Sequence, residues 1–416
     1  MHYLISLYIS IWSSFAYNYI EQLPKPRYTA QQEYRQFVRY QENRIWIPYP
    51  KSTFQQYHQA LDALLDNRQA KVNIVHIGDS HIQADFWSHQ VRQHFQEERS
   101  FGNGGRGYVF PYSMAKAHDP FNLKVNYTGL WQGCKSIQLS RTCSWGLGGM
   151  TATTTDSLAS FTIDPNSRTA QAYPISRVKV YYNVREPKNY FVNLVTENGL
   201  QAPCALSADG YAEFCLPSPQ EKVTFRLEKR FPTQSEFTLE GISLENDQRG
   251  VQYHAVGVNG ATVLSYLKVP NLEPQLHSLS PDLVIISLGT NDAYTTQFDA
   301  EAYKRNLSRL ISRIRMAAPR TSVLITTPGD CGLPGGIINP SNQAARQKIF
   351  ELGEEMDCAV WDLYMVMGGY GSVKRWLKEG LSAGDLVHLT GKGYRLQGDL
   401  LYDALVQDYL NHRLGQ

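Results

Sequence analysis

Short apolar runs that alternate with helix-like runs restrict the fold of this chain more than any other feature of its sequence. In the second half the apolar runs are VQYHAVGV, PDLVIISL, TSVLITTP and CAVWDLY, and helix-like runs such as FDAEAYKRNLSRLISRIRMAA stand between them. The same rhythm occurs earlier, where KVNIVHI at residues 71–77 precedes the helix-like QADFWSHQVRQHFQEE. Strands that are apolar on both faces and alternate with helices are typical of a parallel sheet covered on both sides. The sequence therefore predicts an α/β fold with a three-layer, doubly wound parallel sheet.

Residues 118–248 follow a different pattern. Short β-branched and aromatic runs, among them RVKVYYNV, YFVNLVT, YAEFCLP and KVTFRLEK, are separated by turn clusters such as EPKN, ENG and ADG. Several short strands at close spacing, without a helix-length amphipathic run, favour a β-sandwich or jelly-roll module. We therefore expect one α/β domain, made of residues 17–117 with an N-terminal helical extension and residues 249–416, which this β-rich insertion interrupts.

The first 16 residues are apolar and end in Ser14-Phe15-Ala16, so small residues stand where signal peptidase requires them. The alternative is a buried or membrane-anchoring segment, but the stretch is short for a membrane span. No Cys follows directly that could carry a lipid anchor. The sequence therefore predicts a signal peptide at residues 1–16, export to the periplasm or the extracellular space, and no stable membrane anchor.

All six cysteines lie after this stretch. An even number of cysteines in an exported protein indicates disulfides, although the count alone does not determine the pairing. Proximity along the chain favours the pairs Cys134–Cys143, Cys204–Cys215 and Cys331–Cys358. No CxxC or Cys/His spacing indicates zinc, and we expect neither a metal nor another cofactor.

The charge of the chain is balanced. Forty Lys and Arg residues against 38 Asp and Glu residues leave a formal net charge of +2, and no long basic block is present. Such a chain lacks the electrostatic footprint of a nucleic-acid-binding protein. We therefore expect no nucleic-acid partner, while the sequence contains no signal for the oligomeric state.

Polar residues that could do chemistry follow the predicted strands. In a doubly wound sheet, ligands bind beyond the carboxyl ends of the strands. Four short blocks stand at such boundaries: GDS after KVNIVHI, NGAT after YHAVGV, GTND after LVIISL, and DLVH before the last predicted helix. Each block alone also has a structural explanation, since GDS can be a turn and helix cap and DxxH occurs by chance. Their ordered occurrence at four boundaries favours a common active site.

Together these blocks contain the groups that acyl transfer requires. Ser80 is the candidate nucleophile, and His388 is the base that would remove its proton. Asp385, three residues before the histidine, can hold the imidazole tautomer and stabilise the imidazolium that forms. The backbone N–H groups of Ser80 and Gly260 and the side-chain amide of Asn291 would bind the oxyanion of the tetrahedral intermediate.

The four blocks resemble those of the SGNH, or GDSL-type, hydrolase superfamily, whose name denotes the catalytic Ser, the oxyanion Gly and Asn, and the catalytic His. The resemblance covers residues 71–110 and 250–410. It implies an SGNH-hydrolase fold and a serine esterase with the residue roles given above. One departure is His81, which stands where the nominal motif has Leu.

A closer resemblance is to bacterial peptidoglycan O-acetylesterases, and it rests on GDSHIQADFW, GNGGRGYVFPY, GTNDAY and the position of the β-rich insertion. In those exported enzymes the inserted module resembles a carbohydrate-binding fold. The resemblance implies removal of the acetyl group from the C6 hydroxyl of N-acetylmuramic acid in peptidoglycan, an O-acetylated glycan. An O-acetyltransferase, an esterase for another acetylated polysaccharide or for a lipid ester, and a non-catalytic glycan-binding protein remain alternatives.

Three further polar residues are candidates for supporting roles. Asp79 and Asp292, next to the nucleophile and to the oxyanion asparagine, are expected to bind backbone donors in their turns. Arg106, in the glycine-rich segment, is either structural or a contact for a substrate carboxylate. His76 and His254 stand within apolar runs and are expected to be hydrogen-bonded core histidines.

Overall fold

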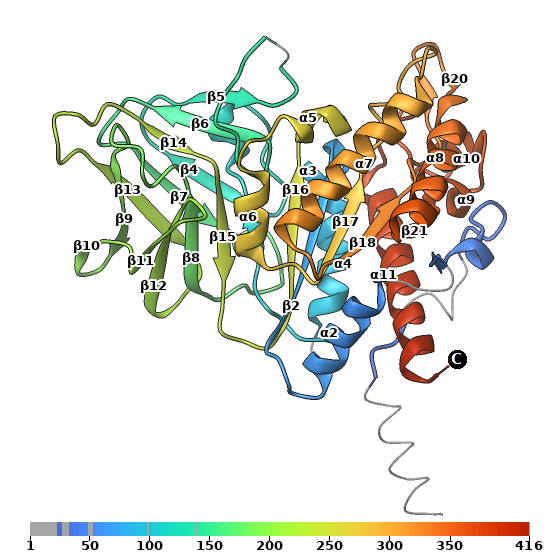
Figure 1. Cartoon of the computed structure of the whole chain (residues 1–416), viewed down its shortest axis with the longest axis horizontal. Helices are drawn as coiled ribbons and strands as arrows, with labels where there is room; N and C mark the ends of the chain where they lie inside the picture. Colours follow the sequence, from blue (N-terminus) through green and yellow to red (C-terminus); the bar gives the residue numbers. More distant parts are fainter. Residues whose placement is uncertain (1–22, 27–32, 49–52, 98–99, 139, 416) are drawn as a thin grey trace, which may run out of the picture.

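The structure of this chain is a computed structural model, and it places an α/β part beside a β-rich part (Figure 1). The predicted signal peptide at residues 1–16 lies outside the described residues. The described residues are 23–26, 33–48, 53–97, 100–138 and 140–415.

A six-stranded sheet forms the centre of the α/β part. Its strands are β1 (Ile45–Trp46), β2 (Lys71–Gly78), β16 (Gly250–Gly257), β17 (Leu283–Ser287), β18 (Ser322–Thr326) and β21 (Ala359–Trp361). The strand order is β1-β21-β18-β17-β2-β16. Strands β2, β16, β17, β18 and β21 are parallel, whereas β1 at the edge is antiparallel to β21. The predicted α/β fold with a parallel sheet is confirmed, but the sequence pattern does not predict β1.

The strand order reverses at β2. This strand comes first along the chain among the parallel five, yet it lies between β16 and β17 in the sheet. The chain therefore runs outward from β2 to β16 and then crosses back to β17 on the other side. In open α/β sheets, ligands bind beyond the carboxyl ends of the strands at such a reversal. The residues that follow β2 and β17 are thus at the position where this fold places a site.

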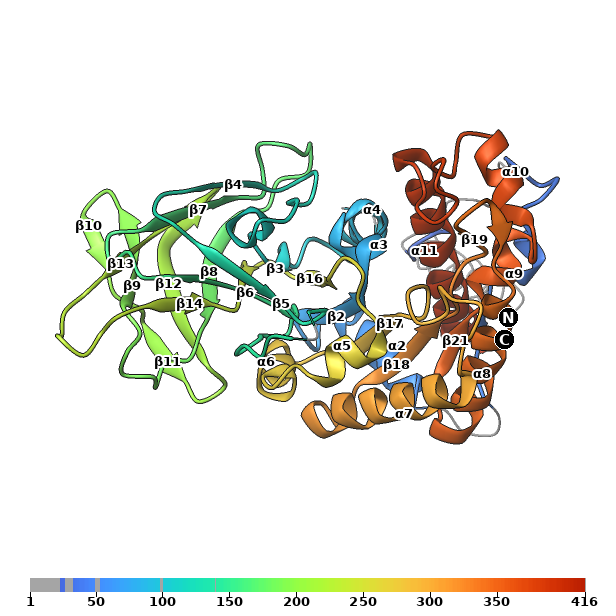
Figure 2. The ribbon, with the colours of Figure 1, turned by 90° about the horizontal axis from the view of Figure 1, so that it is seen from above.

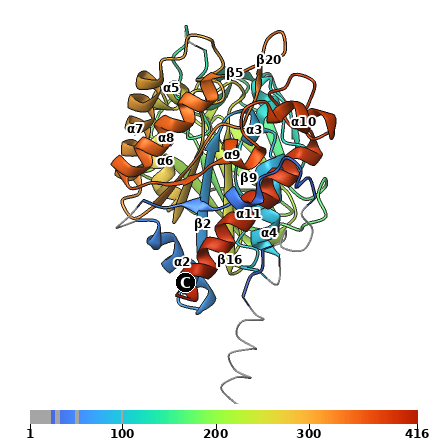
Figure 3. The same ribbon diagram turned by 90° about the vertical axis from the view of Figure 1, so that its right-hand side faces the viewer.

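Helices cover both faces of the sheet. Alternate strand residues face opposite sides, so that Ile285 packs into a core with α2, α4 and α11, while Ile286 packs with α5, α6, α7 and α8. Figure 2 shows α4 and α11 on one side of the sheet and α5, α7 and α8 on the other, and Figure 3 shows the same separation of α11 from α7 and α8. The bounds are α2 (Gln55–Leu65), α4 (Phe86–Gln96), α5 (Val263–Leu267), α6 (Leu272–Leu279), α7 (Ala300–Ala317), α8 (Ser341–Met356) and α11 (Gly391–Arg413).

Shorter elements complete the α/β part. They are η1 (Tyr40–Glu42), α3 (Ser80–Gln83), η2 (Tyr112–Ala115), β19 (Gly332–Leu333), β20 (Ile337–Ile338), α9 (Leu363–Met367) and α10 (Ser372–Lys378). Strand β3 (Gly107–Val109) follows α4 along the chain but is paired within a sheet of the β-rich part. None of the helices in the described residues combines the length and the apolar character that a membrane crossing requires.

The β-rich part consists of antiparallel sheets. The strands are β4 (Lys124–Tyr127), β5 (Gln132–Lys135), β6 (Met150–Thr154), β7 (Ser160–Asp164), β8 (Ile175–Tyr181), β9 (Phe191–Thr196), β10 (Gly199–Gln201), β11 (Ala205–Ser207), β12 (Tyr211–Gln220), β13 (Val223–Glu228), β14 (Phe237–Leu239) and β15 (Gly241–Glu245). Two five-stranded sheets have the orders β10-β9-β13-β7-β4 and β11-β12-β8-β15-β3, and β14-β6-β5 form a third sheet. Buried Phe214 of β12 contacts Phe225 of β13 with a centroid distance of 5.1 Å, which joins the two larger sheets.

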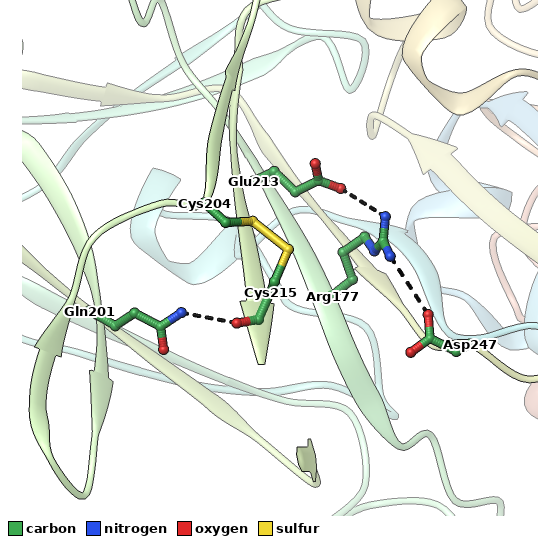
Figure 4. Close-up of a disulfide and its surroundings, with 6 residues drawn as sticks. All are labelled: Arg177, Gln201, Cys204, Glu213, Cys215 and Asp247. Carbon is green, nitrogen blue, oxygen red and sulfur yellow. Dashed lines mark hydrogen bonds and ion pairs between the residues drawn. A yellow bond between two sulfur atoms is a disulfide. The ribbon is translucent and has the colours of Figure 1, made fainter. Parts of the chain in front are cut away.

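Two of the three expected disulfides are present. Cys134 is bonded to Cys143, and Cys204 is bonded to Cys215 (Figure 4). The expected third pair is wrong, because Cys331 and Cys358 are both free and buried. Strands β18 and β21 run parallel, and Cys331 follows the carboxyl end of β18, whereas Cys358 directly precedes the start of β21. The two thiols therefore lie toward opposite ends of neighbouring strands.

Candidate active site

The turn between β2 and α3 carries Ser80. The strand ends at Gly78, Asp79 is the N-cap of α3, and Ser80 is the first residue of the helix. The Asp79 carboxylate accepts a hydrogen bond of 3.0 Å from the backbone N–H of His81, which satisfies one of the free donors at the helix start. The GDS block is therefore a helix cap, and the same cap presents Ser80 at the carboxyl edge of the sheet.

Two glycines let this turn lie directly on neighbouring strand ends. A Cβ atom on Gly257, the last residue of β16, would lie 2.3 Å from the backbone nitrogen of Gln83. A Cβ atom on Gly78 would lie 3.1 Å from the carbonyl oxygen of Ser287 at the end of β17. Close backbone contacts therefore fix the position of the Ser80 turn relative to the ends of β16 and β17.

We expect Gly257→Ala to displace this turn. The added methyl group meets backbone atoms that cannot rotate away, and such overpacking costs about 1–3 kcal/mol. Denaturant unfolding should show this loss of stability, and kcat for ester hydrolysis should fall because Ser80 moves. The matched control is Gly384→Ala, where no atom lies within 4 Å of an added Cβ. Equal stability of the two variants would contradict the proposed close approach.

Ser80, His388 and Asp385 form one hydrogen-bonded line. The Oγ atom of Ser80 lies 2.9 Å from Nε2 of His388, and Nδ1 of His388 lies 2.7 Å from Oδ2 of Asp385. Because a carboxylate can only accept, Nδ1 carries the hydrogen and Nε2 is free to accept the serine proton. Partial burial acts to raise the pKa of Asp385, but hydrogen bonds from His388 and from two backbone N–H groups outweigh it and lower that pKa.

The loop before α11 holds the histidine in place. Oδ1 of Asp385 accepts hydrogen bonds from the backbone N–H groups of Val387 and His388, at 2.9 and 3.0 Å. Leu386 has a positive φ of 60°, an uncommon conformation for this residue, and its carbonyl accepts a hydrogen bond from Gly332 N–H. The side chains of His388 and Asp385 are 43% and 50% exposed, so this line of residues lies at the surface.

Three candidate oxyanion donors come from turns that contact one another. Gly260 has a φ of +77° in the turn after β16, and among the described residues neither its N–H nor that of Ser80 has a protein acceptor. The Asn291 amide, after β17, donates to Asp79 Oδ2 at 3.0 Å and to the carbonyl of Ala261 at 3.1 Å. Both amide hydrogens of Asn291 are therefore engaged, and it can bind an oxyanion only by sharing or releasing one of them.

Asp79 and Asp292 both accept hydrogen bonds from backbone N–H groups beside the candidate site. Asp79 is buried and binds Asn291 with one carboxylate oxygen and the backbone of the Ser80 turn with the other. Asp292 accepts from the backbone N–H of Val263 with both oxygens, at 3.1 and 3.3 Å, and so ties down the start of α5. Burial raises the pKa of Asp292 to about 7.

Arg106 is buried and does not reach the surface at which His388 and Asp385 are exposed. Its guanidinium is buried and donates to Asp85 Oδ2 at 2.7 Å, and Arg92 binds the same oxygen. The role that fits this position is structural, and contact with a substrate carboxylate does not fit it. His76 and His254 are buried and hydrogen-bonded, as expected of core histidines, and burial lowers the pKa of each to about 3.

His81 departs from the motif in the sequence, and it has a defined hydrogen-bonding environment in the structure. Its Nδ1 atom lies 2.7 Å from Asp79 Oδ1 and its Nε2 atom lies 3.2 Å from the carbonyl oxygen of Val387. Its ring is stacked on that of His388 at a centroid distance of 5.4 Å. The sequence contains one signal that could have indicated this role for His81. A titratable residue directly follows the candidate nucleophile, where the motif has an apolar residue.

A small pocket of about 40 Å³ adjoins these residues. Asp79 and His81 line it, together with Thr326 and Asp330, but Ser80 and His388 do not. Ser80 is partly exposed and the His388 side chain is 43% exposed, so the candidate nucleophile is reached from the open surface. Within the part of the chain that the structure describes, no group of three His, Cys, Asp or Glu residues could hold a metal ion.

Comparison with known proteins supports a hydrolase. Residues 233–396 match the model of the GDSL-like Lipase/Acylhydrolase family. A solved structure described as "Peptidoglycan O-acetylesterase in action, 5 min" is similar at 24% identity and a TM-score of 0.72, over 87% of this chain and 99% of that chain. This likeness shows a common fold that extends beyond the α/β part. No curated protein sequence matches this chain.

Two further solved structures are similar to a smaller part of the chain. A lipase/acylhydrolase from Enterococcus faecalis has 23% identity and a TM-score of 0.32, over 38% of this chain and 77% of its own. An acetyl xylan esterase has 21% identity and a TM-score of 0.31, over 37% of this chain and 81% of its own.

Proposed function

We propose that this chain is an esterase that removes O-acetyl groups from a glycan, and the match of residues 233–396 to the GDSL-like Lipase/Acylhydrolase family supports an acylhydrolase. The proposed substrate is peptidoglycan acetylated at the C6 hydroxyl of N-acetylmuramic acid. The fold match over 87% of the chain to a peptidoglycan O-acetylesterase supports this choice, because it includes more than the α/β part. The proposed location is the periplasm or the extracellular space, which two disulfides in the β-rich part support.

In the proposed mechanism Ser80 is the nucleophile. His388 Nε2 takes the hydroxyl proton as Oγ attacks the acetyl carbonyl, and Asp385 stabilises the imidazolium. The N–H groups of Ser80 and Gly260 and the Asn291 amide bind the oxyanion. Collapse of this intermediate breaks the ester bond, and the sugar alkoxide leaves with the proton from His388. Water, deprotonated by His388, then attacks the acetyl-serine, and acetate leaves as Ser80 regains its proton.

The observation that carries the proposal is the Ser80–His388–Asp385 line at an open surface. Sites for small ligands are usually concave and bury most of the ligand. Here the His388 and Asp385 side chains are about half exposed, so a bulky polymer can bring a short acyl group to Ser80. We further propose that the two larger antiparallel sheets form a β-sandwich, inserted at residues 118–248, which contacts the glycan as a carbohydrate-binding-like module.

Acetate release tests this function. Purified protein is incubated with O-acetylated peptidoglycan, with the same peptidoglycan stripped of O-acetyl groups by mild base, and with acetylated xylan. We expect acetate from the first substrate at the highest rate and none from the second, because only the ester-linked acetyl group is removed. Faster release from xylan would contradict the choice of glycan. Net transfer of acetyl groups onto an unacetylated glycan acceptor would contradict hydrolysis as the reaction.

A further inference from the structure

His81 has a hydrogen-bonding environment that only a charged ring satisfies. Nδ1 faces Asp79 Oδ1 at 2.7 Å, and Nε2 faces the carbonyl oxygen of Val387 at 3.2 Å. A carbonyl oxygen and an ionised carboxylate can only accept hydrogen bonds, whereas a neutral imidazole has one N–H group. Both contacts are hydrogen bonds only when both ring nitrogens carry hydrogen. The geometry therefore requires the imidazolium form.

The charges around the ring favour the same form. Burial acts to lower the pKa of His81, but the Asp79 carboxylate and the hydrogen bonds to Asp79 and to Val387 outweigh it and raise that pKa. The side chain of His81 is 15% exposed, so water contributes little to its solvation. The other groups that face the ring are His388, stacked on it, Asp385 beyond that ring, and the edge of Tyr394 from α11.

Through these two hydrogen bonds His81 connects the two halves of the candidate site. On one side it holds Asp79, whose other oxygen binds the amide of Asn291. On the other side it holds the carbonyl of Val387, the residue directly before His388. The oxyanion side and the base side come from turns far apart in the sequence, and His81 contacts both.

We propose that protonated His81 is a positioning residue that keeps the side chains of Asn291 and His388 correctly placed around Ser80. The proposal rests on the proposed function, because it takes those residues as the oxyanion donor and the base. When the ring loses a proton, one of its nitrogens carries a lone pair that points at the lone pairs of an oxygen atom. The hydrogen bond to Asp79 or the one to Val387 is then lost. Activity should then fall with rising pH as His81 is deprotonated.

The test compares pH profiles of kcat for p-nitrophenyl acetate in the wild type and in His81→Leu, which restores the nominal motif residue. The wild type should lose activity as pH rises through the pKa of His81, which lies above its usual value of about 6.5. In His81→Leu this alkaline decline should be absent, and kcat should be about 10–100-fold lower, as expected when catalytic groups are displaced by about 1 Å. An alkaline decline that persists unchanged in the variant would overturn the proposal.

His94→Leu is the matched control. His94 on α4 is 12% exposed and lies 2.6 Å from Asp399, so it is a similarly buried His–Asp pair, and its hydrogen bonds and ion pairs among the described residues involve no residue of the candidate site. Its replacement should leave the shape of the pH profile unchanged. If His94→Leu removes the alkaline decline as His81→Leu does, the effect comes from general destabilisation and the proposal fails.

The charge of His81 can also be measured without turnover. In ¹⁵N NMR spectra of histidine-labelled protein, the His81 signals are those absent from His81→Leu, or from His81→Gln if the leucine variant does not fold. Two protonated ring nitrogens at neutral pH support the proposal, and one contradicts it. This readout is unchanged in Ser80→Ala, so failure of the esterase function and failure of the His81 proposal give different results.

Discussion

Ser80→Ala is expected to lower kcat for ester hydrolysis by about 10⁴-fold or more, because no acetyl-serine can form. The Oγ atom lies 2.9 Å from His388 Nε2, which is the distance that proton transfer to the base requires. The substitution removes one hydroxyl from the first residue of α3, whose cap is the Asp79 carboxylate, so folding should be retained. Initial rates with p-nitrophenyl acetate and with O-acetylated peptidoglycan measure the effect.

The matched control for this variant is Ser312→Ala. Ser312 lies on the exposed face of α7, and its hydroxyl makes one hydrogen bond, to the carbonyl of Ser308. Its removal should change neither kcat nor the unfolding transition appreciably. Retention of wild-type activity in Ser80→Ala, with folding intact, would show that another residue is the nucleophile.

His388→Ala is expected to have an effect of similar size. Without the imidazole, no base accepts the Ser80 proton and no acid protonates the leaving sugar oxygen. Residues that act as a unit are not additive, so the double variant with Ser80→Ala should be no slower than about the worse single variant. Single-turnover and steady-state kinetics of the three variants measure this.

A surface His–Asp pair provides the control for the second prediction. His277 Nδ1 lies 3.1 Å from Asp209, the His277 side chain is 67% exposed, and this ion pair joins no residue of the candidate site. His277→Ala should retain full activity. Additive losses in the double variant would contradict a mechanism in which Ser80 and His388 act in one step.

Much of the α/β part could be predicted because its signals are local. The run KVNIVHI becomes β2, and the amphipathic run that includes Leu307 and Ile311 becomes α7, since apolar periodicity alone specifies both. Strand β1 is only two residues long, which is too short for any periodic signal. Its place beside β21 depends on a pairing between distant parts of the chain.

The failures also have physical reasons. The pair Cys331–Cys358 is close in sequence, but the parallel strands between which these residues lie carry them to opposite ends of the sheet. For Arg106, by contrast, the sequence left a structural role and a substrate contact open, and the buried ion pair with Asp85 that favours the structural role is a contact that no local pattern reveals. Sequence separation is a poor guide to distance wherever a helix or a strand intervenes.

The amino-acid sequence by itself determined the chemical groups of the candidate site and the order in which strands and helices occur. Tertiary structure decided which groups meet. The strand order places β2 between β16 and β17, so that Ser80 and Asn291 share one edge of the sheet, and the loop before α11 brings His388 to the same place. The tertiary structure also places two hydrogen-bond acceptors next to His81, the carboxylate of Asp79 and the carbonyl oxygen of Val387. Hydrogen bonds between residues hundreds of positions apart depend on packing, and local sequence patterns do not encode them.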